Sequence, residues 1–538
     1  MKKWRGLAVL GTAQFLMVLD TSVMNVSISQ LVEDFDTDVT SIQGVITLYT
    51  LVMAAFMITG GKVGDMMGRR RAFAAGLVVY GVGSALTAVS PELWTLALGW
   101  SVIEGLGAAM VLPALAALVA GAYQGRDRAI AYGVIGGLAG AGIAVGPLVG
   151  GWVTTYLSWR LVFAAEAVVV VALLCCVWWI TAPAARESRA RLDTVGAVLS
   201  ALGLSCVVLG VLQSSTWGWV RPRNSPVTVF GFSLTLFVVA AGAVLLWLFR
   251  TWEHRQEARG REPLVRFSIF QVPPLRAGLV MLLAQNLILL GLFFAIPLYL
   301  QIVQGLNAFE TGLRLLPVSV TMFLAALSGP LLGRVAGPRT VVRIGLLVLL
   351  VAIVWLLATI RPRLDDTSFA LAMAVLGLGM GLLASQLGNV VQSSVDEGQR
   401  SEAGGLQYSA QNLGSSLGTA LIGSLLIGAL VSVFISQIEN DPDVSDATRQ
   451  QAGIAVDEGV SFVPTDQVRS SAERAGLPPQ EVDEVVNAYA DAQLNSLKAA
   501  VLAVGGVTLA AFPFTRRLPA TAELSRASGT VRGVERRR

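Results

Sequence analysis

Long apolar runs, separated by short charged segments, constrain this chain more than any other feature of its sequence. A helix needs about 20 apolar residues to cross the hydrocarbon core of a bilayer, and most of the runs reach or exceed that length. Hydrophobic residues make up 54% of the 538 residues and charged residues only 14%, whereas a soluble protein carries roughly 25% charge. The sequence therefore predicts an all-α membrane protein, which has lipid as the solvent for most of its surface.

Fourteen runs are long enough to be spans, and an even number of spans places both termini on the same side of the membrane. The predicted spans cover residues 6–30, 41–61, 72–90, 93–121, 129–152, 160–181, 194–214, 226–250, 275–301, 311–333, 339–360, 367–391, 403–436 and 491–514.

Loop charge predicts the orientation of these spans, because loops rich in lysine and arginine stay in the cytoplasm. Basic residues precede the first run, follow the even-numbered runs and fill the C-terminal tail. We therefore expect a multi-pass protein of the bacterial inner membrane with both termini in the cytoplasm. Residues 437–490 form a long acidic loop, which we place outside, with short amphipathic helices expected at Gln467–Ala475 and Pro479–Ala492.

Cysteine and histidine usage disfavours metal and redox chemistry. The three cysteines lie in apolar runs, and the single histidine, His254, lies in a basic connector. The sequence offers no phosphate-cradling loop and no nucleophile–base pair, so we expect no enzyme, no metal site and no cofactor other than a proton gradient. We expect no nucleic acid partner, and we expect a monomer whose partners are the bilayer, protons and a small amphipathic substrate.

The most specific motif follows the second run and reads G-x-x-x-D-x-x-G-R-R-x-x-F. We expect it to form a short cytoplasmic loop in which the carboxylate accepts hydrogen bonds from a neighbouring arginine or caps a helix. Positive-inside topology explains the arginines but does not require the acid, so we interpret Asp65 as part of a clasp that opens when two halves of the protein rock. The motif residues are Gly61, Asp65, Gly68, Arg69 and Arg70.

A weaker copy of this motif, Gly333–Arg339, follows the tenth run and indicates an internal repeat. Parallel repeats of this kind occur in transporters. We expect a six-helix bundle at residues 1–182, two inserted helices with linkers at 183–266, a second six-helix bundle at 267–515 that includes the loop 437–490, and a basic tail at 516–538.

The loop motif resembles the signature loop of the major facilitator superfamily. Leu19–Ile28 (L-D-T-S-V-M-N-V-S-I) is similar to the first-span motif of the fourteen-span drug:proton antiporters of that superfamily, and Gly142–Gly151 (G-I-A-V-G-P-L-V-G-G) is similar to its fifth-span antiporter motif. The Trp159–Arg160 pair stands where that family has a Trp-Arg pair. The resemblance implies a major facilitator fold, two six-helix bundles plus two inserted central helices, and the exchange of protons for drugs.

The fifth-span motif combines one flat helix face with a bend. Gly142, Gly146 and Gly150 recur at four-residue steps, Gly151 follows them, and Pro147 removes a backbone donor and favours a kink. Such a face packs closely against another helix. We expect either a helix that slides against the other half or ordinary small-residue packing.

Three acids lie inside predicted spans: Asp20, Glu104 and Glu166. An ionisable group deep in a membrane costs several kcal/mol unless it is paired, hydrated or protonated. Such a group suits reversible proton binding and attracts lipophilic cations, although interhelical hydrogen bonding is an alternative role.

The fourth span departs from the pattern of the family that it resembles, which is Arg-x-x-Gln-Gly. Ser101 replaces the arginine to which the family's proton coupling is attributed, and Glu104 replaces the glutamine. Glu166 stands where the sixth span often has asparagine. We therefore hypothesise that Glu104 and Glu166 take over part of the coupling.

Neutral polar residues are scattered through the other spans, where they either line a central cavity or join helices by hydrogen bonds. The leading function is export of amphipathic, often cationic compounds in exchange for protons; the alternatives are a dedicated exporter of one natural product, lipid or siderophore, and a membrane scaffold. The candidate cavity residues are Asn25, Gln285, Asn286, Tyr299, Gln386, Asn389 and Gln411.

Overall fold

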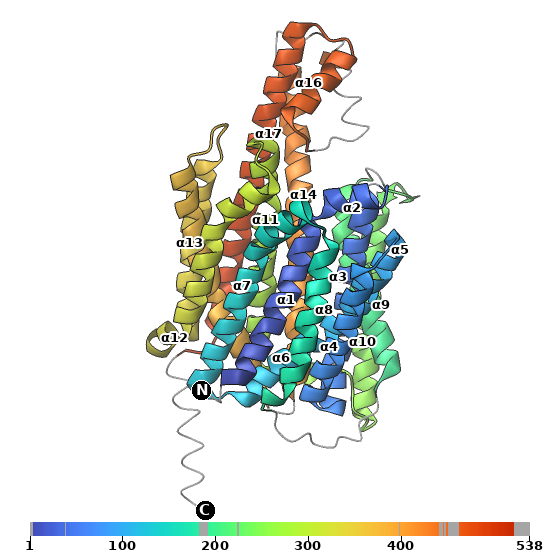
Figure 1. Ribbon diagram of the computed structural model, residues 1–538, viewed down its shortest axis with the longest axis vertical. Helices are drawn as coiled ribbons and strands as arrows, with labels where there is room; N and C mark the ends of the chain where they lie inside the picture. The colour runs from blue at the N-terminus through green and yellow to red at the C-terminus, as the bar shows by residue number, and fades with distance from the viewer. Residues whose placement is uncertain are drawn as a thin grey trace, which may run out of the picture.

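The computed structural model describes residues 4–37, 39–181, 192–222, 225–396, 399–440, 445, 448–449 and 462–520. Within these residues, fourteen helical segments are long and apolar enough to cross a membrane, which confirms the predicted number. They stand side by side (Figure 1). The helical backbone satisfies its own hydrogen bonds, as a chain surrounded by lipid requires.

The first six spans are built from the helices between residues 5 and 176. The first span breaks at Ser27, and the fourth contains a π-helical stretch, named η2. The elements are α1 (Arg5–Val26), α2 (Ile28–Asp34), α3 (Val39–Met67), α4 (Arg69–Ala88), α5 (Leu93–Leu96), η2 (Ala97–Glu104), α6 (Gly105–Ala122), α7 (Gly125–Tyr156) and α8 (Arg160–Cys176), followed by the 3₁₀ turn η3 (Val177–Trp179).

Two further spans follow, α9 (Thr194–Trp217) and α10 (Leu234–Ala258), and α9 packs on both α3 and α14. The short antiparallel strands β1 (Thr228–Val229) and β2 (Phe232–Ser233) precede α10. The eighth span therefore begins at Leu234 and not at residue 226 as predicted, because Phe230 and Gly231 adopt positive φ angles in the turn of the hairpin.

The last six spans lie between residues 273 and 517. They comprise η4 (Phe267–Gln271), α11 (Pro273–Leu298), the π-helical η5 (Tyr299–Val303), α12 (Ala308–Thr359), α13 (Asp366–Ser393), α14 (Arg400–Asn440), α16 (Thr465–Arg474), α17 (Pro479–Ala511) and the 3₁₀ helix η7 (Phe512–Arg517). α12 supplies two spans, which meet at the non-helical Gly337.

Two large clusters make up most of the apolar core in the described residues. One cluster draws on residues 7–180 together with Tyr408, and the other draws mainly on residues 264–518. This division supports our proposal that residues 1–182 and 267–515 form two bundles with the pair α9–α10 between them.

The loop predicted for the signature motif is almost absent. α3 continues to Met67 and α4 begins at Arg69, so the turn consists of Gly68 alone, at φ 91°. Gly337 plays the same part in α12, at φ 77°. Glycine adopts such angles at little cost because it has no Cβ, and the match between Gly68 and Gly337 agrees with the internal repeat.

The predicted outer loop is largely helical. α14 and α17 extend beyond the other helices, with α16 beside α17 (Figure 1). α16 matches the expected helix at Gln467–Ala475, whereas Pro479–Ala492 is not a separate short helix but the first part of α17. At the far end of the chain, Leu518 is buried and Pro519 accepts a hydrogen bond from the backbone of Arg339; residues 521–538 of the expected tail lie outside the described residues.

Candidate functional site: three buried carboxyl groups

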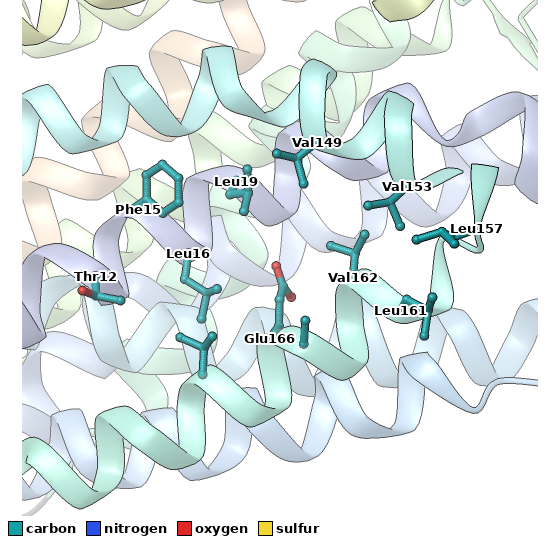
Figure 2. Close-up of a pocket in the computed structure, with 12 residues that line it drawn as sticks. Thr12, Phe15, Leu16, Leu19, Val149, Val153, Leu157, Leu161, Val162 and Glu166 are labelled. Carbon is teal, nitrogen blue, oxygen red and sulfur yellow. The ribbon is translucent and has the colours of Figure 1, made fainter. Parts of the chain in front are cut away.

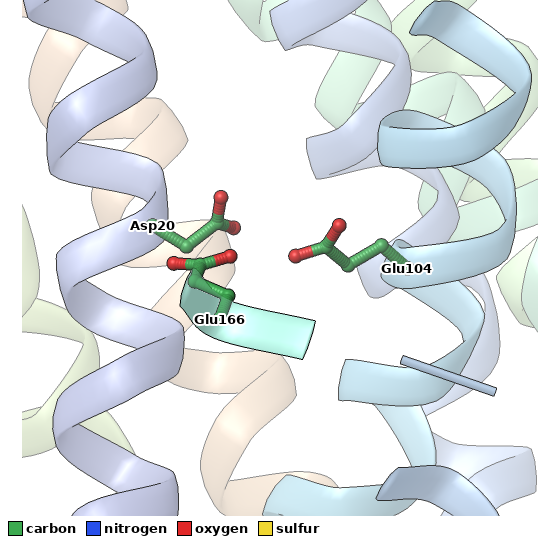
Figure 3. A group of neighbouring side chains, drawn as sticks. All are labelled: Asp20, Glu104 and Glu166. Atoms are coloured by element: carbon green, nitrogen blue, oxygen red, sulfur yellow. The ribbon is translucent and has the colours of Figure 1, made fainter. Parts of the chain in front are cut away.

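Asp20, Glu104 and Glu166 meet inside the first bundle. One carboxylate oxygen of each lies within 4.8 Å of the others, and the side chains are at most 2% exposed. Figure 3 shows them pointing toward one another from α1, η2 and α8. Three helices far apart in sequence thus place three acids in one apolar interior.

Asp20 is held by an aromatic pair that the sequence analysis missed. The indole nitrogen of Trp100 donates to both carboxylate oxygens, at 2.9 and 3.1 Å. Trp100 stacks on Tyr49, with ring centroids 4.5 Å apart and planes 6° apart. Both rings are buried, so the indole donor is fixed in place. Trp100 lies 80 residues from Asp20 in the chain, so no local sequence pattern indicates the contact.

Glu104 ends the π-helical stretch η2, and π-helical turns are frequent at functional sites. Gly83 on α4 brings the two helices close: a Cβ at Gly83 would lie 2.6 Å from the backbone nitrogen of Glu104. Ser101, which stands where the resemblance expects an arginine, donates to the carbonyl of Val45 at 2.7 Å. Ser101 therefore ties η2 to α3 and brings no charge to the site.

Glu166 accepts a hydrogen bond of 3.5 Å from Ser84, and its other oxygen has no hydrogen-bond partner in the described structure. Neither carboxylate oxygen of Glu104 has one either. Among the described residues, no lysine or arginine forms an ion pair with any of the three acids.

This donor set is better suited to protons than to a resident metal. Ca²⁺ takes six to eight oxygen ligands and Mg²⁺ requires octahedral geometry, whereas three buried carboxylates in an otherwise apolar interior supply few. Protons neutralise the acids directly, and a bulky cation would compete for the same negative charge.

The signature motif contacts the other bundle. Asp65 and Arg69 form an ion pair at 3.7 Å, and Arg69 Nε donates to Ser401 Oγ at 2.9 Å. Gly61 makes room for this contact, because a Cβ there would lie 2.8 Å from the carbonyl oxygen of Ser401. Arg70 points elsewhere: its guanidinium lies 5.6 Å from the ring centroid of Trp178. Gly68 is the N-cap of α4, so Asp65 pairs with an arginine and does not cap that helix.

The glycine face of α7 packs within its own bundle and not against the other half. Cβ atoms at Gly142, Gly146 and Gly150 would meet α1, the closest at 2.2 Å from Ser22 Oγ. The contact with α12 uses neighbouring positions instead, where Gly137 meets Phe323. These contacts favour the alternative of ordinary small-residue packing, because the four-residue stripe and the face toward the other half point in different directions on one helix. Gly151 is buried, and the side chain of Pro147 lies outside the described residues.

The candidate cavity residues mostly hydrogen-bond to neighbouring groups. Asn286 donates to Leu282 in its own helix, Gln386 donates to the carbonyl of Gly329, and Tyr299 donates to the carbonyl of Arg361 at the end of its span. The contacts of Gln386 and Tyr299 favour the helix-joining alternative, whereas the contact of Asn286 stays within one helix. Gln285 is buried with an unpartnered side-chain oxygen, Gln411 is half-buried, and the side chain of Asn25 lies outside the described residues.

Asn389 has a different place, because it bridges the two bundles. Arg128 Nε donates to its side-chain oxygen at 3.2 Å, and Tyr408 donates to Gln14 at 2.9 Å across the same interface. Arg400 adds a hydrogen bond to the carbonyl of Ala120. These bridges join residues hundreds of positions apart in the chain, which no periodicity indicates.

A model of the Major Facilitator Superfamily matches residues 10–419. The chain belongs to that superfamily. It is a multi-pass membrane transporter and not an enzyme.

Several related proteins are named as exporters or resistance proteins. The chain is 28% identical to the tetracenomycin C resistance and export protein of Streptomyces glaucescens, over 80% of this chain and 78% of that protein. It is 31% identical to the puromycin resistance protein of Streptomyces alboniger, over 80% and 82%, and 26% identical to the multidrug efflux pump LfrA of Mycolicibacterium smegmatis, over 85% and 86%.

Solved structures show the same fold at low identity. The human organic anion transporter TETRAN aligns over 95% of this chain and 99% of its own, with a TM-score of 0.58 and 14% identity. The proton:xylose symporter XylE aligns over 96% of both chains, with a TM-score of 0.58 and 13% identity.

Proposed function

We propose that this transporter exports amphipathic, often cationic compounds from the cytoplasm in exchange for protons, with both termini on the cytoplasmic side. The observation that carries this proposal is the buried group of Asp20, Glu104 and Glu166, whose carboxylate oxygens lie within 4.8 Å of one another. The names of the related export and resistance proteins support export as the direction.

The three acids cannot all be ionised together, because like charges repel strongly at this spacing in an apolar interior. They therefore hold protons while no cation is present. A lipophilic cation that reaches them supplies the missing positive charge and displaces protons. Since binding of the cation and binding of protons oppose each other, each weakens the affinity for the other by the same factor. Alternate exposure of this site to the two sides couples proton entry to substrate exit.

This scheme needs no arginine in the fourth span. Ser101 forms a neutral hydrogen bond to α3, and Glu104 carries the titrating group one helical turn further along. Trp100 donates hydrogen bonds to both carboxylate oxygens of Asp20. Asp20 is therefore the acid best placed to stay charged and retain a cation.

Glu104→Gln and Glu166→Gln test the proposal. Cells that overexpress the protein should accumulate less ethidium than control cells, and an uncoupler should remove that difference. Each variant should lose this uncoupler-sensitive export, because an amide of similar shape neither carries a proton nor attracts a cation. Glu473→Gln, at an exposed acid of α16, is the matched control and should export normally. Normal export by both variants, with protein amounts unchanged, would show that these acids do not couple transport.

A dedicated exporter of one natural product remains the alternative, because relatives include a protein named for tetracenomycin C and a probable actinorhodin transporter. The two functions differ in substrate range. A resistance profile of a deletion strain against dyes and structurally unrelated antibiotics separates them: sensitivity to several unrelated cations favours multidrug export, and sensitivity to one compound favours the dedicated role.

A further inference from the structure

A groove on the lipid-facing side of the first bundle leads to one of the three acids. We propose that this groove, between α1, α7 and α8, binds lipophilic ammonium compounds from the bilayer and presents them to Glu166. The inference rests on the proposed function, since it names the route by which a substrate reaches the same acids.

The groove has the size and lining of a site for a small apolar molecule. Its volume is about 330 Å³, within the range of sites that bind small molecules. α1 packs closely on α7 along the glycine face, whereas α7 and α8 barely touch, which leaves the space open. The lining residues are Thr12, Phe15, Leu16, Leu19, Val149, Val153, Leu157, Leu161, Val162, Ala165, Glu166 and Val169.

The rim of the groove lies on the outer surface of the first bundle, near the turn between α7 and α8. Leu157 is 57% exposed, Leu161 51% and Val149 39%, and each lies on a membrane-spanning helix or at its end. A molecule dissolved in the bilayer therefore meets the groove without first entering water.

The floor of the groove carries a single acid. Figure 2 shows the carboxyl group of Glu166 pointing into the space between Leu16 and Val162. One of its oxygens has no hydrogen-bond partner in the described structure, and apart from the Thr12 hydroxyl the lining is apolar. An apolar body fits the walls. The unpartnered oxygen of Glu166 is buried beneath the lining, so the side chain must turn toward the groove before an ammonium group forms a charge-assisted hydrogen bond with it. This combination selects a lipophilic amine over a neutral lipid chain.

The groove is also adjacent to the other two acids. Leu19 lines it, and the next residue, Asp20, points into the acid cluster. Since one oxygen each of Asp20 and Glu104 lies within 4.8 Å of an oxygen of Glu166, an ammonium group bound at Glu166 lies next to the other two acids.

Photolabelling of the purified protein in lipid nanodiscs tests this site without transport. The probe is a long-chain alkylamine that carries a diazirine, and its control is the alcohol of the same length. We expect the amine to label peptides of α1, α7 and α8, and Glu166→Gln to lower that labelling at least about tenfold, the equivalent of one charge-assisted hydrogen bond.

Ala165→Trp should fill the groove and abolish labelling, and Leu161→Trp should weaken it. Ala164→Trp, at the neighbouring exposed alanine that does not line the groove, should leave labelling unchanged. Equal labelling by the alcohol, or labelling that survives both Ala165→Trp and Glu166→Gln, would overturn the inference and indicate that lipid chains occupy the groove.

The outcome is separable from that of the proposed function. Specific labelling in a protein that shows no uncoupler-sensitive export would keep the groove and refute proton-coupled export. Normal uncoupler-sensitive export by a protein that the amine never labels would support proton-coupled export and refute the groove.

Discussion

Individual residues around the acid cluster differ in how far they accommodate charge. Asp20 has both oxygens hydrogen-bonded, Glu166 has one, and Glu104 has none within the described structure. An unpaired buried carboxylate is costly, whereas a protonated one is far less so. In the proton exchange that we propose, Glu104 is thus the first candidate for the group that carries the proton.

A second residue-scale feature lies at the end of the bundle remote from the Gly68 turn. Trp159 and Arg160 both donate to Asp34 Oδ2, each at 2.7 Å, and Arg160 also donates to the carbonyl of Ser90. The Trp-Arg pair noted in the sequence therefore has a structural partner that the sequence analysis did not assign. It ties the start of α8 to the end of α2.

This contact predicts a pH-dependent contribution to stability. Partial burial alone would raise the pKa of Asp34. Hydrogen bonds from Trp159 and Arg160 lower the pKa by more than burial raises it, so the pKa lies below its ordinary value of 3.8. A group whose pKa is lowered by folding stabilises the protein fully above its ordinary pKa, and this stabilisation is lost as pH falls through the lowered value. Asp34→Asn should therefore cost about 1 kcal/mol at pH 7, a small value because the pair is near the surface.

Thermal unfolding of the purified protein measures this difference, which should shrink as pH falls below about 4. Asp36→Asn, at an exposed acid of the same segment, is the control and should change little. If the difference in thermal stability between wild type and Asp34→Asn is the same at pH 7 and below about pH 4, this account is contradicted.

At the scale of elements, small residues decide how closely the helices approach. Without a hydrophobic force between helices in lipid, association depends on close packing. α1 and α7 meet along Gly142, Gly146 and Gly150, and this pair forms two of the three walls of the groove that leads to Glu166. The motif resembling the antiporter signature thus has a structural consequence inside one bundle.

Gly146→Ala should therefore destabilise the protein. The added Cβ would lie 2.2 Å from Ser22 Oγ and 2.3 Å from Ser22 Cβ, so the two helices must separate, at a typical overpacking cost of about 1–3 kcal/mol. Gly506→Ala, on α17 where a Cβ meets nothing within 4 Å, should be neutral or slightly stabilising, because alanine favours helices. The thermal stability of both variants in detergent is compared with that of the wild type. Equal stability of Gly146→Ala and Gly506→Ala would show that close packing at Gly146 does not stabilise the protein.

For the whole molecule, the contacts between bundles determine which side of the transporter is closed. The hydrogen bonds from Arg69 to Ser401, Arg128 to Asn389 and Arg400 to Ala120 all start near helix ends on the side of the Gly68 turn. Two bundles held together at that end present a closed face there. The clasp role of Asp65 and Arg69 remains our proposal, and these contacts support it.

Ser401→Ala should make opening of that face more frequent, by about fivefold if one hydrogen bond of about 1 kcal/mol is lost. A reporter cysteine at Ala116, which is buried beside Gly404 of the other bundle, should react faster with a maleimide once Cys175, Cys176 and Cys206 are replaced. Ser496→Ala removes a hydroxyl that bonds only within α17 and serves as the control. Unchanged reactivity in Ser401→Ala would show that this contact does not hold the face closed.

The sequence by itself determined the number of spans, the presence of Asp20, Glu104 and Glu166 within them, and the two similar motifs that contain Gly68 and Gly337. Span length is readable because the bilayer imposes it, and a buried acid is conspicuous because lipid makes it costly. Only the tertiary structure decided that the three acids meet, that Trp100 holds Asp20, and that the glycine stripe faces α1. A helix that is apolar on every side carries little information about which face turns inward, so its rotation and its neighbours are fixed by packing.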